Sequence, residues 1–144
     1  MPLTSICCLV TGLAGRLYLS GHLNRMSAAE LALVREGVAA YEGLRADLAQ
    51  AVPFWPLGLP TSRDQVVVLG LRAPAATYLY LWFPHPGHHG AVALQLPSEV
   101  DGPMIETVYP RSLPAYEQDW DADERVLRLT PTMSGSTARV LRIA

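Results

Sequence analysis

The sequence predicts a mainly β protein with an α-helical segment at its N-terminus. Between residues 27 and 50, apolar side chains recur at spacings of three and four, which is the period of an α-helix. From residue 65 onward the period changes to two, in short runs separated by turn residues. Several closely spaced strands with no helix between them predict an antiparallel sandwich or barrel.

The helical part contains one strong start signal. Ser27 is a good N-cap residue, and Glu30 stands three positions later, which completes a capping box. The apolar stripe that follows predicts an amphipathic helix to about residue 50, and it consists of Leu31, Val34, Val38, Tyr41, Leu44 and Leu48. Before it, residues 3–14 form an apolar run that we expect to be helical, and residues 17–19 read as a very short strand.

The β part begins after Pro53, Pro56 and Pro60, which make a stiff connector. The expected strands are 65–72, 77–83, 90–96, 105–109, 126–130 and 138–143. Turn residues separate them, for example Pro97-Ser98 and Asp101-Gly102-Pro103. In the last strand we expect Arg139 and Arg142 to face solvent.

Composition excludes several classes of function. The 144 residues carry a formal net charge of −2, and the 11 basic residues, all arginine, are scattered, so a nucleic-acid partner is not indicated. The only cysteines, Cys7 and Cys8, are adjacent and offer no disulfide framework, which favours a reducing, cytoplasmic location. Gly15-Arg16 interrupts the first apolar run before it reaches membrane-spanning length, and no basic residue precedes it, so neither a membrane span nor a signal peptide is expected.

Two clusters resemble metal sites, and in both cases a solvated loop is the better interpretation. His85, His88 and His89 lie in a Pro/Gly turn without a nearby Cys or carboxylate. Asp119, Asp121 and Asp123 form a DxDxD pattern that lacks the glycine and the final glutamate of a calcium loop. We therefore expect no metal and no cofactor.

The sequence shows no recognisable catalytic arrangement of its own. A glycosidase needs two carboxylates that flank the scissile bond, and the 13 acidic residues offer no obvious pair. Tryptophans are the residues most suited to stacking on sugars, but Trp82 lies inside an apolar strand and Trp55 in the connector, where packing is the better interpretation. For Trp120 both interpretations, stacking on sugars and packing, stay open.

Three segments together resemble the C-terminal end of family 36 α-galactosidases: GRLYLSGHLNRMS, VPFWPLGLP and VVVLGLRAPAATYLYLWF. The SGHL element and the FWPLGLP connector are the most specific parts. The resemblance implies that residues 1–52 are the last βα unit of a (β/α)₈ barrel, that 53–61 are a connector, and that 62–144 form an antiparallel β-sandwich. It also implies that the chain is a C-terminal fragment of a longer enzyme.

The family hydrolyses terminal α-galactosides with retention and without a cofactor, and its catalytic aspartates lie on barrel strands upstream of this sequence. No catalytic residue is therefore carried over, and we expect the isolated chain to be inactive. By resemblance Ser20, Gly21 and His22 end the last barrel strand, where they either line the sugar pocket or make only a tight turn. Without a barrel, the apolar stripe of the 27–50 helix would be exposed and would favour self-association. The alternative function is a free-standing β-sandwich module that binds carbohydrate or protein.

Overall fold

The computed structural model describes residues 3–100 and 104–144, and it is mainly β with an N-terminal helical segment, as the sequence predicts. The helices are α1 (Leu3–Leu13), the 3₁₀ turn η1 (Leu23–Arg25) and α2 (Ala28–Leu48). The strands are β1 (Val52–Phe54), β2 (Val67–Arg72), β3 (Thr77–Phe83), β4 (Val92–Gln95), β5 (Ile105–Tyr109), β6 (Glu117–Asp121), β7 (Val126–Thr130) and β8 (Thr137–Ile143). They form two antiparallel sheets, with the orders β1-β2-β3-β8-β5 and β4-β7-β6.

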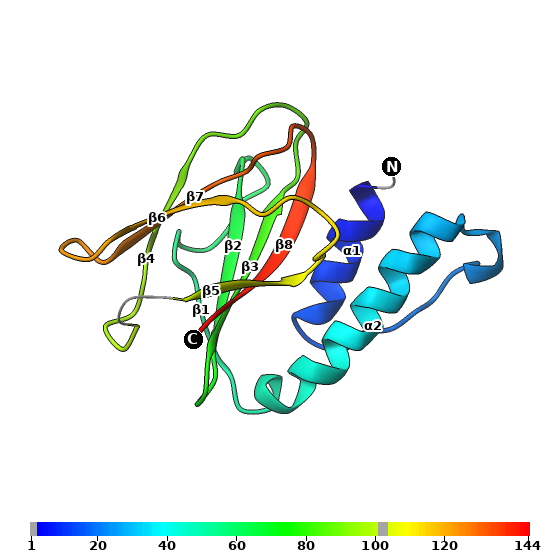
Figure 1. The fold of residues 1–144 in the computed structure, drawn as a ribbon, viewed down its shortest axis with the longest axis horizontal. Helices are drawn as coiled ribbons and strands as arrows, with labels where there is room; N and C mark the ends of the chain where they lie inside the picture. Colours follow the sequence, from blue (N-terminus) through cyan, green and yellow to red (C-terminus); the bar gives the residue numbers. More distant parts are fainter. Residues whose placement is uncertain (1–2, 101–103) are drawn as a thin grey trace.

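The larger sheet is covered on both faces. Figure 1 shows α1 and α2 on one side of it and the β4-β7-β6 sheet on the other. Tyr78 and Tyr80 of β3 belong to the apolar cluster shared with the helices, whereas Leu79 and Leu81 belong to the cluster shared with β4 and β7. The alternation of β3 therefore separates two cores rather than a core and a solvent face.

Helix α2 begins as the sequence predicts. The Ser27 hydroxyl accepts a hydrogen bond from Glu30 N at 3.3 Å, and the Glu30 carboxylate accepts one from Ser27 N at 2.7 Å, so the capping box is complete. The helical interpretation of the preceding apolar run is also confirmed by α1. No helix in the described ranges is long and apolar enough to cross a membrane.

Several predicted elements differ from the structure. Residues 17–19 form no strand, because no described segment makes the backbone hydrogen bonds of a ladder with them. The connector contains a short strand, β1, which pairs with β2, and the acidic segment 117–121 is a strand rather than a turn, because it pairs with β7. The predicted turn at Asp101-Gly102-Pro103 lies outside the described residues.

The prediction that Arg139 faces solvent is wrong. Its residual exposure is 1 %, and Arg142 is half-buried. The reason is that β8 lies between β3 and β5, in a sheet with a layer on each face. A strand at that place is covered on both faces. The alternation of polar and apolar residues along it therefore does not indicate which side chains are exposed.

The expectation that the apolar stripe of α2 stays uncovered is also wrong for Val34 and Leu44, which are buried in the helix–sheet cluster. Helix α1 and strand β5 supply the covering surfaces. Two tyrosines reinforce this packing, since the Tyr80 hydroxyl donates to the carbonyl of Leu13 at 2.9 Å and the Tyr109 hydroxyl donates to the carbonyl of Leu33 at 3.2 Å. The helices and the larger sheet therefore share one core.

Candidate functional site

The segment between α1 and α2 runs back along two parallel helices. The hydroxyl of Tyr80 bonds Leu13 at the C-terminal end of α1, and the hydroxyl of Tyr78 bonds Asp47 near the C-terminal end of α2. Tyr78 and Tyr80 are two residues apart on β3, so both helices end at the same side of the sheet. Figure 1 shows the two helices running in the same direction and the chain between them returning. The order is helix, extended segment, helix.

The backbone of this extended segment is unpaired. Among the described residues, no backbone hydrogen bond joins residues 17–20 to another segment. Its side chains are apolar but exposed, to 74 % for Tyr18 and 44 % for Leu19. Apolar, extended chain normally pairs its N–H and C=O groups with neighbouring strands. Residues 17–20 depart from this rule, because no described segment pairs with them.

A groove of about 330 Å³ lies beside the segment, between it and the two helices. Ser20 and Gly21 line it, together with residues of α1 such as Cys8 and Gly12. Leu17 packs closely on α1, since a Cβ on Gly12 would lie 2.6 Å from its Cδ1. The groove residues include no carboxylate, so they offer hydrogen bonding and apolar contact but no acid–base pair.

The third residue of the expected sugar-binding set does not line this groove. His22 caps the 3₁₀ turn η1, and its carbonyl accepts a hydrogen bond from Arg25 N at 2.8 Å. Ser20 and Gly21 thus line the groove, and His22 belongs to the start of the 3₁₀ turn instead.

The histidine turn has a packing role. The ring of His89 lies 4.7 Å from the Phe83 ring centre, and its Nε2 is 3.2 Å from the carbonyl oxygen of Gly135. No group of three or more metal-ligating side chains is assembled in the part of the chain that the structure describes.

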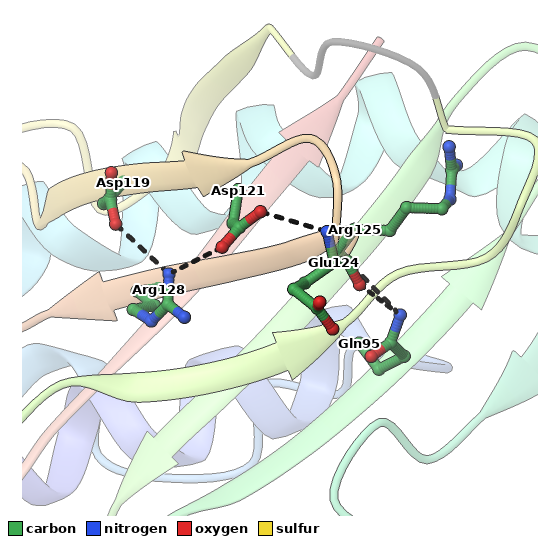
Figure 2. A network of polar contacts seen from close by, with 6 residues as sticks. All are labelled: Gln95, Asp119, Asp121, Glu124, Arg125 and Arg128. Carbon is green, nitrogen blue, oxygen red and sulfur yellow. Dashed lines mark hydrogen bonds and ion pairs between the residues drawn. The ribbon is translucent and has the colours of Figure 1, made fainter.

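The acidic pattern at 119–123 is divided between a strand and a turn. Figure 2 shows Arg128 of β7 between two carboxylates, at 3.3 Å from Asp119 and 3.8 Å from Asp121. The second oxygen of Asp121 accepts a hydrogen bond from Glu124 N at 3.0 Å and so closes the β6–β7 turn. These carboxylates already have a cation and a backbone donor as partners.

Sequence reasoning missed Arg125, the turn residue just before β7, which lies in the left-handed region with φ of 55°. Its guanidinium donates to the carbonyl oxygens of Pro97, Ser98 and Val100, and Gln95 donates to the main chain of residues 124 and 125 (Figure 2). These bonds fix the loop after β4 against the β6–β7 hairpin. Only the turn pattern before Arg125 was visible in the sequence.

Comparison of the chain with protein-family models, with curated proteins and with solved structures finds no match. The geometry above is therefore the basis of the functional argument.

Proposed function

We propose that this chain is the C-terminal part of an α-galactosidase-like glycoside hydrolase. In this proposal α1, the extended segment and α2 complete a (β/α)₈ barrel formed with upstream chain, and the two β sheets form the C-terminal β-sandwich. The observation that carries the proposal is the unpaired segment 17–20 between two parallel helices. The motif resemblance of SGHL and FWPLGLP adds the family.

A strand between two parallel helices needs parallel strands as its neighbours. A strand that alternates with parallel helices runs opposite to both of them, and its neighbours in the sheet must be parallel strands reached through such helices. Leu17, Tyr18 and Leu19 are consecutive apolar residues, a pattern typical of strands buried on both faces. A closed barrel would supply a neighbour on each edge and cover both faces.

The same proposal gives roles to the expected site residues. Ser20, Gly21 and His22 follow the carboxyl end of the segment, and in (β/α)₈ enzymes this end faces the substrate. Ser20 and Gly21 would border the galactoside, and His22 would shape the turn behind them. Retaining hydrolysis requires two carboxylates, which the proposal assigns to upstream strands.

The alternative is a free-standing carbohydrate- or protein-binding module, and it has less support. Flat aromatic rings on an open face are the usual means of holding sugars. The indole of Trp82, however, donates to the carbonyl oxygen of Cys7 at 3.4 Å and stacks on Tyr80, so its ring lies under α1.

The coding DNA upstream of Met1 is the direct test. We expect an in-frame region that encodes alternating strands and helices. The purified 144-residue chain should not hydrolyse a chromogenic α-galactoside, whereas the longer product should. In the longer product Leu19→Asp should abolish hydrolysis, and the exposed control Leu59→Asp should retain it. Hydrolysis by the short chain, or an upstream region without such a frame, contradicts the proposal.

A further inference from the structure

Helix α2 is held on the larger sheet at two points. Near its start the Tyr109 hydroxyl donates to the carbonyl of Leu33, and near its end the Tyr78 hydroxyl donates to the carboxylate of Asp47. Near the first anchor the helix and the sheet are in van der Waals contact, because a Cβ on Gly37 would lie 3.6 Å from Cε2 of Tyr109. These anchors set the distance between the helix and the sheet.

Between the anchors the contact opens into a cavity of about 300 Å³. The helix contributes small residues there, Ala39, Ala40 and Gly43, and a Cβ on Gly43 would meet no atom within 4 Å. The cavity is open to solvent, since Ala39 and Gly43 on the helix side and Glu106 on the sheet side are exposed. Its volume is at the small end of ligand pockets, which span roughly 300–1,000 Å³.

The opposite wall of the cavity is polar. Tyr78, Arg142 and Glu106 are direct neighbours across β3, β8 and β5. Glu106 binds Arg111 at 2.9 Å through its Oε1, and no ion pair joins Arg142 to a described carboxylate. Arg142 therefore has donors that no described carboxylate occupies, and its register neighbour on β5, Glu106, carries an acceptor.

The charges of the lining balance. Glu36 and Glu106 contribute two negative charges, and Arg111 and Arg142 contribute two positive ones. A lining with no net charge does not favour a free anion or cation over a neutral molecule. An adjacent donor and acceptor match two neighbouring hydroxyl groups, one of which accepts while the other donates.

We propose that the cavity between α2 and β5 binds a small neutral polyol of monosaccharide size. One hydroxyl accepts from Arg142, its neighbour donates to Glu106, and the apolar face of the molecule rests on Ala40 and Gly43. All of these residues belong to this chain, so the site is independent of the proposed barrel and of Ser20.

Saturation-transfer NMR on the full chain with a panel of monosaccharides and inositol tests the proposal. We expect transfer from at least one neutral polyol, together with a shift of the Gly43 amide resonance. Gly43→Leu fills the cavity and should weaken binding at least tenfold, and Arg142→Met should do so without filling it. The control is Ala46→Leu, which adds one carbon atom fewer at an exposed position of α2 that does not line the cavity.

Three outcomes overturn the proposal. The first is no transfer from any polyol in the panel. The second is binding that survives both Gly43→Leu and Arg142→Met while the thermal transition shows a folded protein. The third is preferential binding of acetate or a simple amine, because it would show that the lining selects an ion. Activity of the proposed longer enzyme does not enter these measurements.

Discussion

The guanidinium carbon of Arg139 lies 5.0 Å from the centre of the Tyr116 ring, in the interior of the protein. Its nitrogens also donate to the hydroxyl of Thr137 and to the carbonyls of Pro114 and Ala138. No carboxylate in the described ranges forms an ion pair with it. Burial lowers the pKa of Arg139 from its ordinary value, and the neighbouring Tyr116 acts in the opposite direction. The cation is thus held by a ring face and main-chain oxygens rather than by a counter-ion.

This arrangement predicts how Arg139 variants differ. Arg139→Met keeps most of the volume and removes the desolvated charge, so the lost hydrogen bonds and the lost desolvation cost nearly cancel, and the free energy of unfolding should change by about 1 kcal/mol or less. Arg139→Ala leaves a cavity and should lower it by about 3 kcal/mol. Urea unfolding measures both. A Met variant as unstable as the Ala variant would show that the hydrogen bonds dominate.

Alkaline pH should unfold the protein through its buried tyrosines. Burial raises the pKa of Tyr116 to about 12, and burial also raises the pKa values of Tyr78, Tyr80 and Tyr109. A raised folded-state pKa means that the stabilisation is complete below the unfolded value, about 10, and is lost as the pH rises through the folded value. For Tyr116 the loss is on the order of 3 kcal/mol.

Denaturant unfolding at pH 8 and at pH 11 measures this effect. Tyr116→Phe keeps the ring and removes the ionisable hydroxyl, so this variant should lose less stability between the two pH values than the wild type does. An equal loss in both proteins would contradict the role of Tyr116.

Gly70 should be intolerant of any side chain. It pairs with Phe54 across β1 and β2, and a Cβ there would overlap three atoms of the Phe54 ring. Gly70→Ala must displace the ring or the short strand β1, and should cost about 1–3 kcal/mol. Gly90→Ala is the matched control, because a Cβ there meets nothing within 4 Å. Thermal unfolding of both variants is the measurement, and equal midpoints would show that Phe54 moves aside freely.

Self-association of the isolated chain should depend on the extended segment rather than on α2. Tyr18 and Leu19 combine exposed apolar side chains with unpaired backbone, which is the usual hazard of an open strand. Sedimentation of Tyr18→Ser/Leu19→Ser should show a lower average mass than the wild type. Leu59→Ser removes an equally exposed apolar side chain in the connector, at 76 %, and should leave the mass unchanged. The reverse ranking would place the interface at the connector.

Local rules were enough where neighbouring residues decide the structure. Ser27 and Glu30 satisfy each other three residues apart, so the start of α2 was visible in the sequence. The change of period after the prolines predicted the β part in the same way, since a run such as 77–83 pairs with strands of its own kind. For Ser20 and Gly21 the sequence left a pocket-lining role and a tight turn open, and of the three expected residues His22 does not line the groove.

The tertiary structure decided which segments pair as strands and which side chains the layers bury. The charged segment 117–121 becomes a strand because β7 lies beside it and Arg128 offsets its carboxylates. The apolar residues 17–19 form none because no described strand pairs with them. Arg139 is buried because the sheet around β8 is covered on both faces, and a strand's alternation indicates only that its two sides differ. The sequence by itself determined where α2 begins and which residues alternate in runs such as 77–83. Which of them have a neighbour, and on which side, depends on contacts between residues far apart in the chain.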